Sequence, residues 1–293
     1  MSKRKKRPSK IPLYAVRNVS EKVNAAFEIV KENWRPLLRL SAYVLVPISI
    51  VQGLGINNMF ASTFNDTEFP VVAAIVAGVF SLIGISATTA LIITLLQWYD
   101  THDDALATAS LTAMRRQLAR NFFKCLLVYM VSAIILVPGL ILSGVMSIVI
   151  PVLFLLFLAA MLPLILIHPI FLLEDCSFYI AFSRAFKLGY SRWGQLVGLG
   201  FTMSFAAIIM MNISTIPWTV SLFVVETLGH KSSAYGWKVF SELLFYVFTI
   251  VQCLVSYLGL AFFIVAATLH YTSVATDVEQ VNIENEIENF ENL

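Results

Sequence analysis

Long apolar stretches without a charged side chain dominate the chain and predict membrane-spanning helices. They cover residues 40–65, 69–99, 125–173, 195–225 and 243–276. A helix rises about 1.5 Å per residue, so roughly 20 apolar residues are needed to cross a hydrocarbon core of about 30 Å. Every stretch is long enough for one crossing, and the longest, 125–173, must fold back on itself.

The turn within that longest stretch is expected near its middle. Pro138 and Gly139, followed by Gly144 and Ser147, interrupt a regular helix, and Pro151 is tolerated in the first turn of the next one. Six spans result, at residues 37–56, 71–97, 123–143, 148–173, 196–223 and 242–270. The predicted fold class is therefore all-α, an integral membrane bundle of six transmembrane helices.

Three amphipathic stretches precede the first, third and fifth spans. In each, apolar residues recur every three or four positions, as they do on one face of an α-helix. The three apolar faces are Val16, Val19, Val23, Phe27, Val30 and Trp34; Leu111, Met114, Leu118 and Phe122; and Phe178, Phe182, Phe186 and Trp193. Basic residues lie beside each face. The sequence thus predicts three cytoplasmic interfacial amphipathic helices, each leading into a hairpin of two spans.

Polar residues mark where these three helices begin. Asn18, followed three residues later by Glu21, matches a capping box, in which each side chain bonds the other residue's backbone N–H. Ser177 is a typical N-cap for the third amphipathic helix. The start signals for the second are Thr101, Asp103 and Asp104.

The amphipathic helices also form the candidate contact surface. Each exposed base near an anionic leaflet gains about 1 kcal/mol of attraction. The same pattern suits a docking collar for a cytoplasmic partner or a site for a lipid headgroup, and the sequence does not separate these alternatives. The candidate partner or lipid contacts are Phe178, Phe182, Arg184, Lys187, Arg192, Arg115, Arg116 and Arg120.

The uneven distribution of basic residues predicts the orientation of the spans. Of the 20 lysines and arginines, 18 lie at residues 3–39, 115–124 and 184–192, which are the N-terminal segment and the loops after the second and fourth spans, together with the adjoining span ends. Lys231 and Lys238 fall between the fifth and sixth spans. Because basic loops stay on the cytoplasmic side of a membrane, both termini are expected in the cytoplasm.

Part of the chain resembles polytopic bacterial membrane proteins grouped with the glycerophosphoryl diester phosphodiesterase membrane domain. The matching letters are HPIFLLEDCS at 168–177, AFSRAFKLG at 181–189, RWG at 192–194 and FEIVKENWRPLL at 27–38. The resemblance implies a location in the bacterial cytoplasmic (inner) membrane. It implies no phosphodiesterase activity, because members carry that activity on an additional soluble domain, for which 293 residues are expected to leave no room.

Composition excludes an ordinary soluble domain and separates two charged tails. The chain is 58% hydrophobic and 13% charged, against roughly one-quarter charged in soluble proteins. We expect a basic cytoplasmic tail at 1–10, a single six-helix transmembrane domain at 11–276 and an acidic cytoplasmic tail at 277–293. The basic tail should lie on the anionic leaflet, and the acidic tail should be disordered until a partner binds it.

Signals for catalysis are sparse. The spans carry no charged residue near their middle, where ion-coupled transporters usually keep one. The histidines, His102, His168, His230 and His270, and the three cysteines are too dispersed for a metal site. His168 is expected to be a neutral, hydrogen-bonded structural residue. We expect no catalytic residue, metal, cofactor or nucleic-acid partner, and we infer that the protein is not an enzyme.

Two functions remain open. The first is a non-enzymatic integral membrane scaffold, or accessory subunit of a membrane complex, that recruits a membrane or cytoplasmic protein through its cytoplasmic face. The alternative is a small permease or lipid-handling transport protein. A cavity at mid-membrane depth would favour the alternative, and its expected lining is Asn212, Ser214, Thr215, Gln252 and Ser256.

Small residues predict where helices approach closely. Ala74 with Gly78, and Gly194 with Gly198, are spaced four apart, which places each pair on one helix face without a bulky side chain. We expect helix contacts at both pairs.

Overall fold

The computed structural model describes residues 10–64, 70–102, 106–145, 162–229 and 235–291. These residues are almost entirely helical and form no β-strand, as the sequence predicts. The helices are α1 (Val19–Glu32), α2 (Trp34–Phe64), α3 (Val71–Thr101), α4 (Leu111–Val145), the 3-10 helix η1 (Leu162–Leu166), α6 (Ile167–Leu173), α7 (Phe178–Ser191), α8 (Trp193–Val224), the π-helix η2 (Val225–Gly229) and α9 (Tyr235–Glu291).

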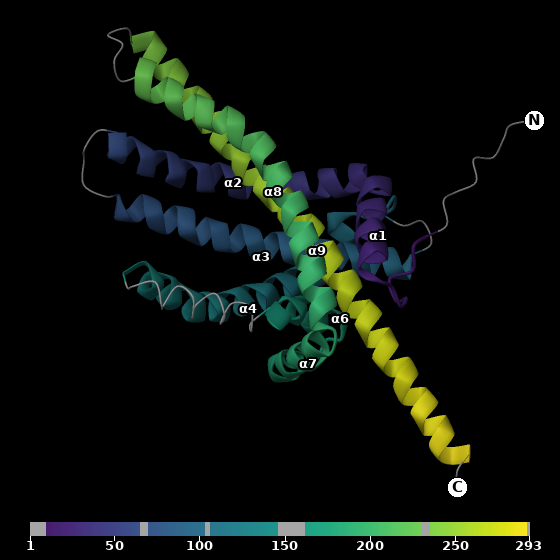
Figure 1. The fold of residues 1–293 in the computed structure, drawn as a ribbon. Helices are drawn as coiled ribbons and strands as arrows, with labels where there is room; N and C mark the ends of the chain where they lie inside the picture. Colours follow the sequence, from purple (N-terminus) through teal and green to yellow (C-terminus); the bar gives the residue numbers. More distant parts are fainter. Residues whose placement is uncertain (1–9, 65–69, 103–105, 146–161, 230–234, 292–293) are drawn as a thin grey trace, which may run out of the picture.

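Two helix pairs, α2 with α3 and α8 with α9, form the main body of the molecule. Figure 1 shows the α8–α9 pair running diagonally across α2 and α3, with α4 beside α3 and with α1, α6 and α7 gathered at one end. Helix α9 contacts α1, α2, α3 and α8. The buried core therefore lies where α9 crosses α3, and residues 86–96 and 264–275 are buried there almost without interruption.

Four helices are long and apolar enough to cross a membrane: Trp34–Ser62, Val71–Thr101, Trp193–Thr227 and Gly236–Val278. Their free faces carry large apolar side chains, and Phe201, Ile213 and Ile216 of α8 are 76%, 69% and 67% exposed. Such surfaces are stable against lipid rather than against water. The structure thus supports a helical membrane protein with four of the six predicted spans.

The remaining two predicted spans are not established. The third, 123–143, lies inside α4. Most of the fourth, 148–173, lies outside the described residues, and its last part forms the shorter apolar segment Leu162–Leu173.

Helix α1 begins as predicted but buries a different face. Asn18 Oδ1 accepts from the Glu21 N–H at 2.9 Å, and Glu21 Oε2 accepts from the Asn18 N–H at 3.0 Å, so the capping box is present. The most buried residues, however, are Lys22, Ala25, Ala26 and Ile29. Of the predicted apolar face, Val19, Val23 and Val30 are partly buried against the core, whereas Val16, Phe27 and Trp34 are exposed. Because α1 packs against α8 and α9, its small alanines allow the closest contact.

The other two amphipathic stretches differ from each other. Residues 111–122 form no separate helix, because α4 runs from Leu111 to Val145 without a break. Its first turn is capped by Ser110, which accepts from the Ala113 N–H at 3.3 Å, whereas Thr101 ends α3 and Asp103 and Asp104 lie outside the described residues. Helix α7 is separate, and Ser177 caps it as predicted.

The small residues that bring helices together differ from those predicted. At Gly55 of α2, an added Cβ would lie 2.8 Å from the Ala77 backbone nitrogen, so α2 and α3 touch through Gly55 and Ala77. At Gly78 and Gly194 an added Cβ would meet nothing within 4 Å, whereas at Gly198 it would lie 3.9 Å from Val19 Cγ1 of α1. The contact residue Ala77 lies one position before Gly78. The spacing of small residues therefore predicts that α3 approaches another helix closely, but it places the contact one residue too late.

The acidic end of the chain is helical rather than disordered. Helix α9 continues past residue 277 to Glu291. Asp277 anchors this extension by pairing with Arg192 at 2.6 Å.

The described start of the chain is bound to the helices. The Ile11 N–H donates to Tyr99 Oη at 2.9 Å, and Thr272 Oγ1 donates to the Leu13 carbonyl at 2.8 Å. Residues 1–9 of the basic tail lie outside the described residues.

Candidate functional site

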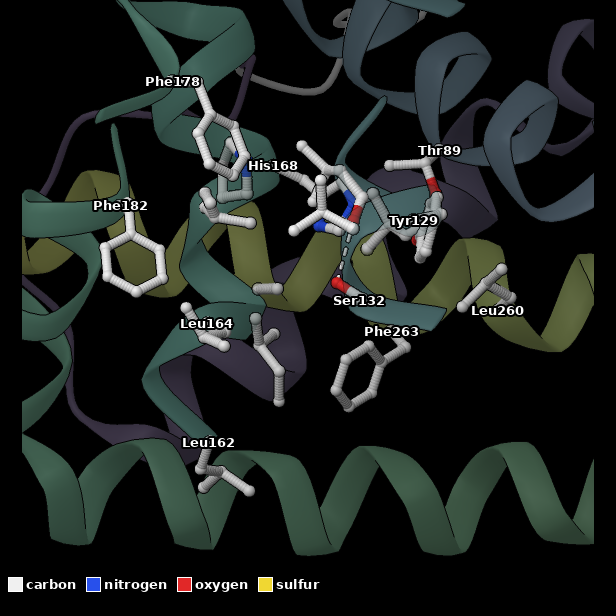
Figure 2. A pocket seen from close by; sticks show the side chains of 17 residues that line it. Thr89, Tyr129, Ser132, Leu162, Leu164, His168, Phe178, Phe182, Leu260 and Phe263 are labelled. Carbon is white, nitrogen blue, oxygen red and sulfur yellow. Dashed lines mark hydrogen bonds between the residues drawn. The ribbon is translucent and has the colours of Figure 1, made fainter. Parts of the chain in front are cut away.

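A cavity of about 670 Å³ lies among α3, α4, η1, α6, α7 and α9. Figure 2 shows Thr89 and Tyr129 on one side of it, Phe178 and Phe182 on the other, and His168 between them. Its size falls within the range of small-molecule sites, roughly 300–1,000 Å³. The described lining holds no charged side chain, and its apolar wall includes Val128, Leu164, Phe178, Phe182, Phe263 and Ile264.

The irregular backbone of η1 and the close approach of α7 shape this cavity. Pro163 lies within the 3-10 helix η1, and Pro169 lies in the short helix α6. Proline lacks an N–H and interrupts the regular α-helical bonding pattern. Gly189 of α7 packs directly on η1, since an added Cβ would lie 2.5 Å from Pro163 Cβ. This contact places Phe178 and Phe182 at the cavity wall.

Three hydroxyl groups form the polar part of the lining. Thr89 Oγ1 donates to the Ile85 carbonyl at 2.9 Å, so its only proton is used. The 2.8 Å contact between Thr89 Oγ1 and Tyr129 Oη is therefore a hydrogen bond that Tyr129 donates. Ser132 Oγ donates to the Val128 carbonyl at 2.8 Å. Each hydroxyl proton is thus already engaged within its own helix or with its neighbour.

His168 completes the polar part of the lining. Its ring centroid lies 4.4 Å from that of Tyr129. Its Nε2 is buried and has no hydrogen-bond partner among the described residues, so the expected hydrogen bonding is absent at this nitrogen. A buried polar atom without a partner costs about 1–3 kcal/mol, and such atoms are uncommon in folded proteins. An unpaired ring nitrogen beside an apolar cavity is consistent with a ligand site.

The predicted contact residues divide into three groups. Phe178 and Phe182 line the cavity. Three of the predicted bases are engaged in ion pairs: Arg184 with Glu174, Arg192 with Asp277, and Arg120 with Asp175. The other three, Arg115, Arg116 and Lys187, are exposed and make no ion pair with a described residue.

The loop after α6 is held by two of these acidic partners. Asp175 pairs with Lys124 at 2.5 Å and with Arg120 at 3.0 Å, and the Lys124 hydrogen bond and charge lower the pKa of its carboxyl group. Glu174 accepts hydrogen bonds from Arg184 and from Tyr271 Oη. The base-rich helices are thus fixed to the rest of the bundle.

The five polar residues predicted to line a cavity lie elsewhere. Ser214 Oγ donates to Gln252 Oε1 at 2.5 Å, and Gln252 Nε2 donates to Thr215 Oγ1 at 3.0 Å, which ties α8 to α9. Asn212 and Ser256 bond backbone carbonyls of their own helices. None of the five is among the residues that line the 670 Å³ cavity. The sequence reasoning missed Thr89, Tyr129 and Ser132, which carry no distinctive motif.

A second buried polar cluster surrounds Lys22, one of the basic residues that lie beside the predicted apolar face of α1. Its side chain is fully buried, and Nζ donates to Gln195 Oε1 at 2.9 Å and to His270 Nδ1 at 3.2 Å. Burial, assisted by the charge of Arg192 and opposed by that of Asp277, lowers the pKa of Lys22 to about 8. This cluster joins α1 to both α8 and α9.

The comparisons with known proteins found no match. No protein-family model, curated protein or solved structure matches the chain. The resemblance to the glycerophosphoryl diester phosphodiesterase membrane domain therefore stays a prediction. Within the described residues, no group of three or more His, Cys, Asp and Glu side chains is placed to hold a metal ion.

Proposed function

We propose that the protein is a non-enzymatic membrane protein that binds an apolar molecule of the lipid class in the cavity, which is the lipid-handling alternative. The observation that carries this proposal is the apolar cavity of about 670 Å³ with its uncharged described lining. Protein interiors are normally close-packed, so an apolar molecule in this space would restore dispersion contacts that an empty cavity lacks.

A membrane scaffold or accessory subunit is the second candidate function. It is favoured by Arg115, Arg116 and Lys187, which are exposed and unpaired among the described residues. These bases could contact anionic lipid or an acidic surface of a membrane or cytoplasmic protein. Lipid binding and partner recruitment use different parts of the molecule, so one protein can combine both.

We further propose six spans with both termini in the cytoplasm of a bacterium. The proposal rests on the distribution of basic residues, 18 of which fall on one side of such a bundle. It implies that Lys187, before α8, is cytoplasmic and that Gly236, after η2, faces the opposite side.

A topology experiment tests this orientation with single cysteines. In a background where the three native cysteines are replaced by alanine, Gly236→Cys should react with a membrane-impermeant thiol reagent added to intact cells. Lys187→Cys should react only after the cells are opened. Both positions are exposed in the structure, so a lack of reaction cannot be attributed to burial. Labelling with the two positions reversed would contradict the orientation.

A cavity-filling variant tests ligand binding. Ala267 lines the cavity and is 5% exposed, so the ring of Ala267→Phe should occupy part of the ligand space. We expect tightly held apolar molecules, extracted from detergent-purified protein and quantified by mass spectrometry, to fall by roughly threefold or more, because a blocked pocket loses most of its buried contact area.

The matched control is Gly200→Phe, because an added Cβ at Gly200 of α8 meets nothing within 4 Å. It adds the same ring to the outer face of the bundle and should leave the extracted amount unchanged. Equal retention by the wild-type protein and a folded Ala267→Phe variant would refute the cavity as the ligand site.

A further inference from the structure

The hydrogen bonds around the cavity define what a ligand must offer. Tyr129 already donates its proton to Thr89, and Ser132 donates its proton to the Val128 carbonyl. The oxygens of both hydroxyls therefore retain only acceptor capacity toward a ligand. His168 Nε2 can donate or accept, depending on its tautomer. A ligand hydroxyl group can donate its one proton to one of these two oxygens and can accept a hydrogen bond from His168 Nε2 when that nitrogen carries the proton.

Charge gives a second requirement. The described lining contains no lysine, arginine, aspartate or glutamate. A carboxylate or phosphate in such surroundings would lose its hydration without gaining a counter-charge, which is strongly unfavourable. An ionised headgroup is thus a poor fit, whereas a hydroxyl group meets both requirements.

We propose that the cavity selects an uncharged lipid alcohol, a molecule with a long apolar chain and a hydroxyl headgroup. The proposal rests on the proposed lipid-binding function and names its ligand class. The hydroxyl lies beside Tyr129, Ser132 and His168, and the apolar chain lies toward α7 and η1. Figure 2 shows Phe182, Leu162 and Leu164 on that side of the cavity, away from Thr89 and Tyr129.

Three ligands of equal chain length separate the requirements: hexadecanol, hexadecanoic acid and hexadecane. Binding of each to delipidated protein is measured at pH 8 in the same detergent, by competition with radiolabelled hexadecanol. We expect hexadecanol to bind about tenfold or more tightly than the ionised acid, and about fivefold more tightly than the alkane, since one hydrogen bond contributes about 1 kcal/mol.

A tyrosine variant tests whether Tyr129 Oη accepts the hydrogen bond from the ligand's hydroxyl group. Tyr129→Phe removes the acceptor, while Thr89 keeps its bond to the Ile85 carbonyl. It should bring hexadecanol close to the affinity of hexadecane and leave hexadecane binding unchanged. The matched control is Tyr246→Phe, because Tyr246 bonds the Ile50 carbonyl away from the cavity, and it should keep the full preference.

The outcomes distinguish the two proposals. If none of the three ligands binds folded protein, the lipid-binding function itself is wrong. If the acid binds as tightly as the alcohol, lipid binding stands but the uncharged headgroup is wrong. If the alkane binds as tightly as the alcohol, or Tyr129→Phe keeps the preference, the hydroxyl pairing is wrong.

Discussion

Gly84→Ala is expected to destabilise the protein by about 3 kcal/mol or more, because α9 leaves no room for a side chain at this position of α3. An added Cβ would overlap the phenol of Tyr257, which is 4% exposed. The tyrosine cannot move without losing its hydrogen bond to Gln52 Oε1 of α2, at 2.5 Å. Overpacking costs about 1–3 kcal/mol, and the broken buried bond adds about 1 kcal/mol.

The control for Gly84→Ala is Gly78→Ala in the same helix. An added Cβ there meets nothing within 4 Å, so the change should be neutral or stabilising by up to about 1 kcal/mol, as expected for replacing a helical glycine. Thermal unfolding in detergent measures both variants. If Gly84→Ala and Gly78→Ala unfold at the same temperature, α9 does not cross α3 at Gly84.

Lys22→Ala should also lower stability strongly, by about 3 kcal/mol. The substitution leaves Gln195 Oε1 and His270 Nδ1 without their buried donor, and hydrogen bonds from a charged group contribute about 1.5–3 kcal/mol each. Lys31 provides the control, because it is in the same helix, is exposed and makes no ion pair with a described residue. Lys31→Ala should change stability by less than about 0.5 kcal/mol.

The same lysine predicts a pH dependence. Its pKa is about 8 in the folded protein, below the ordinary value of 10.5. Between these two values the unfolded chain binds more protons than the folded one, so the free energy of unfolding should rise with pH. The difference between wild type and Lys22→Met, measured from pH 7 to pH 10, should show this rise in the wild type alone. A constant difference would mean that Lys22 keeps its ordinary pKa.

Much of the fold could be predicted from the sequence because the membrane restricts the backbone. An apolar stretch in lipid must satisfy every N–H and carbonyl internally, so long uncharged stretches become helices. Four predicted spans coincide with α2, α3, α8 and α9. The starts of α1 and α7 were also predictable, because Asn18 and Ser177 cap their own helices through contacts only three residues long.

The candidate site was only partly predictable. Phe178 and Phe182 stood out because they recur every four residues beside charged ones, and both line the cavity. Tyr129 and Ser132 lie in an uncharged stretch where every helix face is apolar, so periodicity does not indicate which face meets a cavity. Their roles depend on η1 and α7, which pack against each other through Pro163 and Gly189.

The sequence by itself determined the helical membrane class, four of the long apolar helices and the starts of α1 and α7, since these follow from local composition and short-range capping. Only the tertiary structure decided that Lys22 is buried rather than solvated, that α9 continues through the acidic end, and that His168 borders a cavity. These properties arise where segments far apart in the chain meet. Lys22 lies beside His270 because α1 packs on α9, and no local pattern encodes that contact.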